Sequence, residues 1–374
     1  MAHAYTPGLK VARKTLVRKE RRLPLPGKVI VSKGQRVKAE DVVAKADIPG
    51  NVHPVNVAGL LGVSPSELIS FMVKKEGDKV KKGEIIAETK GLFGLFKNKV
   101  FSPCDGIIES ISSITGQVII RENPIPVEVL AYIDGEVIDI IENEGVIVET
   151  IASFIQGIFG VGGEVIGVLK LAVNSPEEEL TPEKIPDDVN GKILVGGSFV
   201  TIEAIEEAKK KGAKGIVVGG IDDMNLKKFL GYDIGVAITG SENTGLTLII
   251  TEGFGKMKMA KRTFELLQEL DGKKASCNGA TQIRAGVIRP EIIVSYEEKV
   301  KIEEEDDSLK EGMNVGTLVR IIREPYFGKI GKVKSLPPEL RKIDTESNVR
   351  VVEVELEDGN VVVVPRANVE IIEE

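Results

Sequence analysis

The sequence between residues 73 and 87 reads Val73-Lys74-Lys75-Glu76-Gly77-Asp78-Lys79-Val80-Lys81-Lys82-Gly83-Glu84-Ile85-Ile86-Ala87. A related segment follows at residues 102–108 and reads Ser102-Pro103-Cys104-Asp105-Gly106-Ile107-Ile108. Apolar residues mostly alternate with charged ones, and Gly-Asp or Asp-Gly pairs interrupt the alternation. A period of two is typical of strands with one buried face, and such glycine pairs are typical of tight turns. The stretch therefore predicts short, half-buried β-strands joined by tight turns.

The pattern recurs within the first 150 residues. The positions Gly34, Val37, Val42 and Ala44 recur 43 positions later as Gly77, Val80, Ile85 and Ala87. The positions Asp105-Gly106 and Gly116 recur 29 positions later as Asp134-Gly135 and Gly145. This part of the chain is therefore internally repetitive.

These motifs resemble the biotinyl/lipoyl-like barrel-sandwich hybrid, whose two similar β halves carry a Gly-Asp-x-Val strand-turn and a Ser-Pro-x-Asp-Gly strand. The resemblance covers about residues 28–150. It implies a fold and leaves the function open, because the scaffold serves carriers, transporter adaptors and polymerase subunits alike. A carried cofactor is not expected. The biotin-like run Met257-Lys258-Met259 lies far beyond the repeats, and no lysine between them has the flanks of a lipoyl acceptor.

Length and composition predict a multidomain protein of the ordinary globular kind. The chain has 374 residues, 42% of them hydrophobic and 29% charged, and a net charge of -7. A mild acidic excess gives no overall attraction to nucleic acid or to an anionic membrane. The apolar run at residues 146–171 is interrupted by Glu149, Gln156 and Glu164, so we expect strands there and no membrane segment. We expect a cytoplasmic location. Abundant Lys, Glu, Ile and Val with little Gln and Cys is typical of a thermophile.

Cysteine and histidine are too scarce for most catalytic or metal-binding patterns. The chain has two of each, Cys104 and Cys277 with His3 and His53. We expect buried free thiols and no metal site. The run Ser276-Cys277-Asn278-Gly279 has the look of a nucleophile loop, but a cysteine nucleophile needs a base beside it. We therefore expect Cys277 to be a buried thiol without a catalytic role.

The sequence predicts three modules with an arm and two linkers. Residues 1–27 form a basic arm that either binds phosphates or lies across the adjacent domain. Residues 28–173 form the barrel-sandwich hybrid, and residues 174–190, rich in Pro, Glu and Asp, form a linker. Residues 191–296 form an α/β domain, residues 297–308 an acidic linker, and residues 309–374 a C-terminal barrel. The expected class is a multidomain α+β protein.

The middle domain is predicted from strands that alternate with helices. Strands are expected at residues 192–195, 215–219, 234–239 and 246–251, with helices at residues 202–211, 222–230 and 259–270. In such largely parallel sheets, ligands bind beyond the carboxyl ends of the strands. Candidate ligand loops there contain Gly197, Ser198, Gly220, Thr239, Glu252, Gly253 and Gly255, and Lys258 follows them. The alternative is that these are ordinary loop glycines.

The C-terminal sequence carries Pro325-x-Phe327-Gly328-x-x-Gly331 after an apolar strand, and strands are expected at residues 349–356 and 361–365. It resembles a KOW motif in an SH3-like barrel, as found in NusG/Spt5 transcription factors. The resemblance implies contact with RNA or with protein. Seven basic residues stand against two acids between Arg320 and Lys342, although residues 309–374 carry ten basic and twelve acidic residues. The candidate contact residues are Arg323, Tyr326, Phe327, Lys329, Lys332 and Lys334.

Two functions follow from this inventory. The first is a non-enzymatic adaptor that docks onto a larger assembly in transcription or translation, with a protein partner or RNA on the C-terminal barrel. The second is an enzyme, or a sensor of a small molecule or anion, with its site at the strand ends of the α/β domain. In that case Glu252 is the expected acid or base, because it is the carboxylate among the candidate loops.

Overall fold

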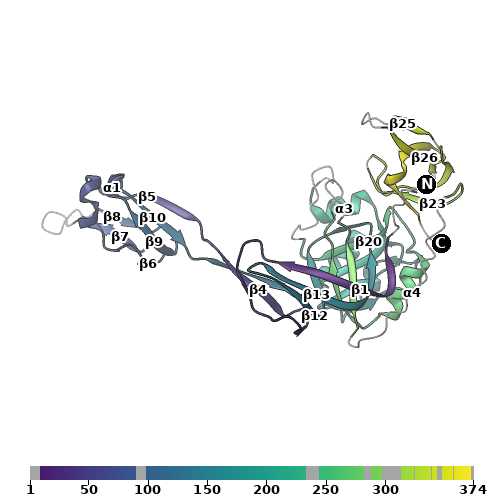
Figure 1. Cartoon of the computed structure of the whole chain (residues 1–374), viewed down its shortest axis with the longest axis horizontal. Coiled ribbons are helices and arrows are strands. Elements are labelled where there is room, and N and C mark those ends of the chain that lie inside the picture. The colour runs from purple at the N-terminus through teal and green to yellow at the C-terminus, as the bar shows by residue number, and fades with distance from the viewer. Residues whose placement is uncertain are drawn as a thin grey trace.

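The computed structural model describes residues 9–89, 98–232, 244–281, 288–296, 313–323, 325–337, 339–342, 348–356 and 358–371. The protein is mostly β and has several lobes. Figure 1 shows a large body with helices on it, a small distal lobe (residues 52–122) at one end, and a C-terminal module (residues 313–371) at the other. A thin neck, residues 49–51 and 123–124, connects the distal lobe to the rest. The protein is therefore elongated.

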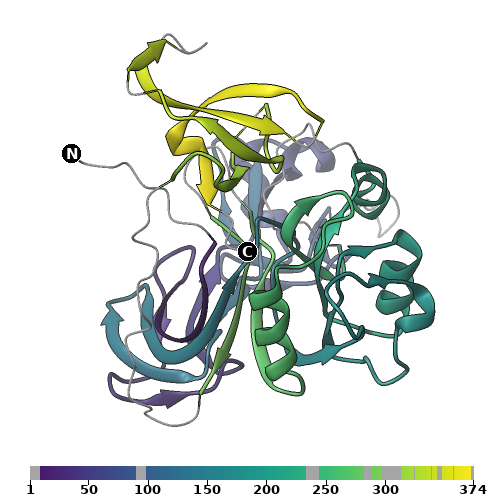
Figure 2. The same ribbon diagram turned by 90° about the vertical axis from the view of Figure 1, so that its right-hand side faces the viewer.

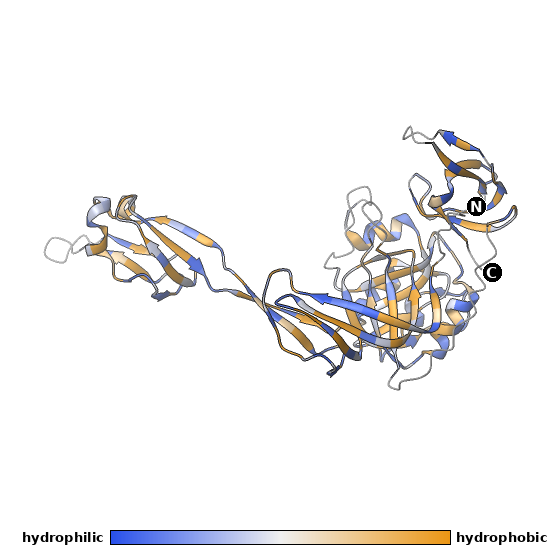
Figure 3. Ribbon diagram, in the orientation of Figure 1, coloured by the Kyte–Doolittle hydropathy of each residue, from blue (hydrophilic) through white to orange (hydrophobic). Residues whose placement is uncertain are grey.

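The body is organised by one 11-stranded sheet that curls into a half-barrel. Its path is β14 (Phe159–Val161), β20 (Thr247–Phe254), β19 (Gly215–Ile221), β17 (Lys192–Val195), β15 (Glu164–Leu171), β21 (Lys274–Asn278), β22 (Glu291–Ser295), β13 (Gly145–Gln156), β12 (Gly135–Ile141) and β3 (Arg36–Val37). Strand β1 (Val11–Arg22) also pairs with β13. In Figure 3 the body strands are largely orange, as expected for strands that are buried.

Four neighbouring strands of this sheet, β15, β17, β19 and β20, are parallel, and α-helices lie in the connections from β17 to β19 and from β19 to β20. Helix α2 (Ile202–Lys210) begins where the Thr201 side chain accepts a hydrogen bond from the Ala204 amide. Helix α3 (Asp223–Leu230) is capped in the same way by Asp222, and α4 (Lys261–Glu269) follows β20. The alternation of strand and helix predicted for this region is confirmed. The strand expected at residues 234–239 lies outside the described residues.

The sheet crosses the domain boundary that the sequence suggested near residues 174–190. Strand β15 precedes that segment, β17 follows it, and the two are parallel neighbours. The segment itself contains β16 (Glu179–Leu180) and a 3-10 helix (Pro182–Lys184). Three of its side chains, Leu180, Ile185 and Val189, belong to the main hydrophobic core. Its few apolar residues thus anchor it to the body, and it is a covering segment where we had expected a free linker.

The basic N-terminal arm forms the long strand β1 and lies across the body. It pairs with β13 in antiparallel register from Val11–Ile155 to Arg22–Gly145. Its cations bond to carboxylates of the body: Arg13 to Glu269, Arg18 to Glu149, Lys19 to Glu291, Arg21 to Glu164 and Arg22 to Glu144. Of the two alternatives for this arm, the structure shows the one that lies across the domain, with these five cations paired to carboxylates.

The sequence repeats correspond to two nested β units. The proximal unit comprises β2 (Lys28–Val29), β3, β4 (Val42–Ile48), β11 (Ile125–Leu130) and β12. In it the Gly34 amide donates to the Val137 carbonyl at 2.7 Å. In the distal lobe the Gly77 amide donates to the Ile108 carbonyl at 2.8 Å. Both glycines have left-handed backbone, with φ of 84° and 88°. The two copies therefore share a backbone conformation and a hydrogen bond as well as a sequence pattern.

The distal lobe carries its own hydrophobic core, which includes Val57, Leu68, Ile86, Ile108 and Ile120. Its elements are β5 (Val52–Asn56), α1 (Val57–Leu61), a 3-10 helix (Pro65–Phe71), β6 (Lys79–Val80), β7 (Ile85–Glu88), β8 (Lys99–Phe101), β9 (Gly106–Ile111) and β10 (Gln117–Glu122). Strands β5, β10, β9 and β6 form one sheet, and β7 pairs with β8.

The C-terminal module is a six-stranded antiparallel sheet. Its strands are β23 (Leu318–Ile321), β24 (Ile330–Ser335), β25 (Leu340–Lys342), β26 (Asn348–Leu356), β27 (Val361–Pro365) and β28 (Val369–Ile371). A 3-10 helix (Arg366–Asn368) joins the last two. A core of its own contains Val319, Val333, Val352 and Val354. Figure 2 shows the module over one end of the body.

Among the described residues, no helix has both the length and the apolar character needed to cross a membrane. The longest helices in the described part of the chain, α2 and α4, have nine residues each. The apolar run at residues 146–171 forms β13, β14 and β15, as its interrupting polar residues predicted.

Candidate functional site

The C-terminal module meets the body through a buried network of four charged side chains. The Arg320 guanidinium of β23 donates to Glu370 Oε1 of β28 at 2.9 Å and to Glu252 Oε2 of β20 at 2.8 Å. Arg289, which precedes β22, places Nη2 2.7 Å from Glu370 Oε2. Two arginines and two glutamates balance in charge, so the network joins the module to the body without a net buried charge.

Burial makes this network energetically important. The side chains of Arg320 and Glu370 are only 2% and 1% exposed. Glu252 is also fixed from its other side, because its Oε1 accepts from the Ala260 amide at the start of α4 at 2.9 Å. Glu252 was the acid or base that the sequence suggested. In the structure both of its oxygens are hydrogen-bonded within the protein.

An aromatic contact runs beside the charged network. The Phe254 ring of β20 lies 5.4 Å from Phe159 and 6.1 Å from Phe327, measured between ring centroids. Gly328 is close enough that a Cβ there would lie 2.9 Å from the Phe254 ring. Phe327, a predicted contact residue, is therefore half-buried against the body core.

The other predicted contact residues divide between the core and the surface of the module. Tyr326 is half-buried and packs against the core of the C-terminal module. The four basic side chains are exposed, namely Arg323, Lys329, Lys332 and Lys334. On β24 the alternation places Val333 inside and both neighbouring lysines outside. Lys334 lies 3.7 Å from Glu355. The four cations are thus exposed, with Lys332 and Lys334 on the same side of β24, whereas the two aromatic rings are half-buried.

The candidate ligand loops of the α/β region meet one another through their backbones. A Cβ on Gly220 would lie 2.1 Å from the Gly255 carbonyl oxygen, and one on Gly197 would lie 2.3 Å from the Glu178 carbonyl oxygen. A Cβ on Gly253 would lie 3.1 Å from the Gly328 carbonyl oxygen of the C-terminal module. The buried Ser198 hydroxyl donates to the Glu177 carbonyl at 2.6 Å. These small residues allow close packing of backbone. Thr239 lies outside the described residues, and the ligand role of the loops stays a prediction.

The candidate Lys258 lies on the surface between Met257 and the buried Met259. Its ammonium is 3.9 Å from Glu177, and its side chain is 68% exposed. The Met-Lys-Met run is therefore part of the connection from β20 to α4, where Met259 packs in the core.

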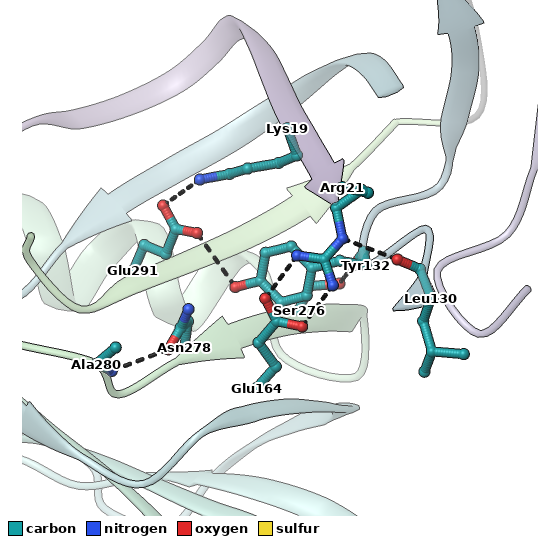
Figure 4. A network of polar contacts seen from close by, with 9 residues as sticks. All are labelled: Lys19, Arg21, Leu130, Tyr132, Glu164, Ser276, Asn278, Ala280 and Glu291. Carbon is teal, nitrogen blue, oxygen red and sulfur yellow. Dashed lines mark hydrogen bonds and ion pairs between the residues drawn. The ribbon is translucent and has the colours of Figure 1, made fainter. Parts of the chain in front are cut away.

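Sequence reasoning missed a polar network around Tyr132, drawn in Figure 4. Tyr132 is 1% exposed and has a φ of 70°, which is uncommon for a residue with a side chain. The Arg21 guanidinium lies 5.0 Å from its ring centroid, and its hydroxyl donates to Glu291 at 3.3 Å. Burial, followed by the Glu291 carboxylate, raises the pKa of Tyr132 well above its usual value. Through its contacts with Arg21 of β1 and Glu291 of β22, the un-ionised Tyr132 side chain links these two strands.

A groove of about 620 Å³ opens beside this network, lined by Glu20, Arg21, Arg22, Glu128, Val129, Leu130 and Glu164. Its charged side chains are paired, since Arg21 binds Glu164, Arg22 binds Glu20 and Lys45 binds Glu128. The positive and negative side chains that line the groove are therefore already paired with opposite charges of the protein itself.

A second constellation that the sequence did not suggest lies at the base of the distal lobe. His53 Nε2, Cys104 Sγ and a Glu122 carboxylate oxygen lie within 4.8 Å of one another. These residues are 51 and 18 positions apart along the chain, so no local spacing indicates that they meet. The prediction of no metal site counted only cysteines and histidines and did not consider a carboxylate as the third ligand.

Cys277 is buried in the body core, as the sequence predicted. Desolvation raises the pKa of its thiol far above the usual value, and the Glu291 carboxylate adds to the shift. We expect iodoacetamide to label Cys277 in the native protein at least on the order of 100-fold more slowly than in urea-unfolded protein, because thiolate is the reactive form. Peptide mass spectrometry over a time course measures this. Labelling of the native thiol at the unfolded rate would contradict the buried placement.

No protein-family model matches the chain, and no curated protein matches it.

Proposed function

We propose that the protein is a non-enzymatic adaptor, and that its C-terminal module contacts a protein partner within a larger assembly. The observation that carries the proposal is the arrangement of the parts. Two β lobes stand at opposite ends of an elongated molecule (Figure 1), and each has its own hydrophobic core. An adaptor needs separate surfaces for separate partners, and the two lobes offer such surfaces at the two ends of the molecule.

The resemblances found in the sequence support the same function. The repeats of the proximal unit and distal lobe are similar to barrel-sandwich hybrids, and the C-terminal module is similar to a KOW barrel. Both kinds of module serve as docking parts in larger machines. A role in transcription or translation is the finer proposal that follows from the KOW resemblance.

The charges of the C-terminal module favour protein over nucleic acid as the partner. On its outer face Lys334 lies near Glu355, and Arg341 donates to Glu353 at 3.0 Å. Nucleic acid binding depends on cations that are free to neutralise phosphates. A face that alternates cations with carboxylates instead suits a protein surface of mixed charge.

The packed loops at the strand ends of the α/β region also favour a non-enzymatic function. Glu252 has both oxygens engaged, and the Ser198 hydroxyl is directed at a backbone carbonyl. A catalytic acid or nucleophile needs access to a substrate. The described loops pack on each other and on the segment at residues 174–190.

The test is a charge reversal on the exposed face, Lys329→Glu with Lys332→Glu. We expect a partner identified with the wild-type protein to bind the double variant at least about tenfold more weakly, because mixed-charge contacts become repulsive. Quantitative pull-down from native lysate, followed by titration with the purified partner, measures the effect. A nuclease-treated sample separates a protein contact from an RNA contact.

The matched control reverses two exposed lysines of the distal lobe, Lys79→Glu with Lys81→Glu. It changes the net charge equally and leaves the C-terminal module untouched. Equal binding by both double variants and the wild type would contradict the proposal. Truncation of the module is unsuitable as a test, because it would leave Glu252 and Arg289 buried without their partners.

A further inference from the structure

The three side chains at the base of the distal lobe come from different segments. His53 lies on β5, Cys104 in the turn between β8 and β9, and Glu122 at the end of β10. Strands β5 and β9 flank β10, and this pairing brings the segments together. His53 Nε2 is 2.8 Å from Glu122 Oε1, and the three potential ligand atoms lie within 4.8 Å of one another.

We propose that His53, Cys104 and Glu122 bind a divalent transition-metal ion of the zinc class, with a fourth position open to solvent. Imidazole nitrogen, thiolate sulfur and carboxylate oxygen are the three ligand types that zinc takes in proteins. Three protein ligands with an open position are typical of zinc sites that keep a water or an external ligand. This site is independent of the adaptor function proposed above.

One of the three proposed ligands is buried and the other two are partly exposed, as expected for a metal site that is open to solvent on one side. Cys104 is buried at 8% exposure and forms the inner side. The side chains of His53 and Glu122 are 37% and 31% exposed and form the outer side. An ion can therefore enter from solvent and keep one face toward it, while the sulfur lies at the edge of the distal-lobe core.

The surroundings orient the ligands. Asn51 donates its side-chain amide to Glu122 Oε2 at 3.0 Å, leaving the other oxygen directed at His53. The Ser102 hydroxyl donates to the Cys104 carbonyl at 2.7 Å and fixes that turn. Such outer partners hold ligating groups in position and are a regular part of protein metal sites.

Electrostatics favour a metal over a cysteine nucleophile. His53 is hydrogen-bonded to Glu122, and a nucleophile would need the imidazole directed at the thiol. A bound dication would instead hold the cysteine as a thiolate ligand.

The site would act as a cross-link at the root of the lobe. It joins β5 and β10, the two strands that continue into the neck, to the turn that opens β9. Binding to the folded form alone raises the stability of that form. Zinc should therefore raise the melting temperature of the distal lobe in the full-length protein.

Cobalt(II) is the probe, because a thiolate ligand gives it a charge-transfer band in the near ultraviolet. Tag-free, full-length protein, stripped with a chelator and reduced, is titrated with cobalt and then with zinc in competition. We expect one equivalent to produce the band and zinc to remove it. Cys104→Ser should abolish the band, and His53→Gln or Glu122→Gln should weaken binding by at least about tenfold.

The chain contains a matched control for two of the ligands, since it has one other cysteine and one other histidine. Cys277→Ala and His3→Gln should bind cobalt as the wild type does, and circular dichroism establishes that each variant is folded. The inference is overturned if the wild type gives no thiolate band, if Cys104→Ser keeps it, or if folded Cys277→Ala loses it equally.

Discussion

Replacing Arg320 with methionine is expected to lower the free energy of unfolding by about 3–5 kcal/mol. Methionine fills much of the same volume but removes the positive charge between Glu252 and Glu370. The Glu370 side chain, 1% exposed, would keep only Arg289, and Glu252 would keep only the Ala260 amide. A buried carboxylate without its cation is costly because water cannot replace the lost partner.

Calorimetry of the full-length protein measures this effect, supported by circular dichroism because the chain has no tryptophan. The matched control is Arg341→Met, which removes an arginine paired with Glu353 on the exposed face, where the arginine side chain is 49% exposed. Exposed pairs contribute little, so the control should change stability by at most about 1 kcal/mol. Equal effects of the two replacements would show that the Arg320 network is not buried in solution.

The second large effect is expected from Gly220→Ala, which should destabilise the body by about 3 kcal/mol, near the upper end for overpacking. The added Cβ would lie 2.1 Å from the Gly255 carbonyl oxygen and 3.1 Å from the Met257 amide nitrogen, and both of these are backbone atoms. Strand β19, which contains Gly220, is buried along its whole length.

Gly163→Ala is the control, because a Cβ there meets nothing within 4 Å, and its effect should stay within about 0.5 kcal/mol. The comparison also separates the two interpretations of the strand-end glycines. Close packing predicts a lower melting temperature for Gly220→Ala. A variant as stable as the wild type would instead favour glycines that leave room for a ligand.

Local patterns in the sequence predicted the local structure well. The helix expected at residues 202–211 is α2, Ile202–Lys210, with Thr201 as its cap, and the strand expected at residues 361–365 is β27. The repeats predicted two matching strand-turns, and the structure gives them matching hydrogen bonds. Each of these features is fixed by residues a few positions apart, which is the range that periodicity and turn chemistry report.

The contacts that assemble these pieces could not be obtained in this way. Leu180 and Val189 looked like isolated apolar residues in a polar linker, yet they complete the body core. Arg320 and Glu252 are 68 positions apart, and their pairing depends on how the C-terminal module meets the body. The same holds for His53, Cys104 and Glu122. Charge and residue type alone do not say which groups a fold will bring together.

The order of the repeats along the chain determines how the two β units are connected. The first strand-turn, near Gly34, pairs with the last Asp-Gly strand, near Gly135, and the second, near Gly77, pairs with the one near Gly106. The second pair therefore lies between the two members of the first pair along the chain. In the chain the whole distal lobe lies between β4 and β11 of the proximal unit, so the neck is where the chain leaves that unit and returns to it. A load applied to the distal lobe therefore reaches the body only through the two chain segments of the neck.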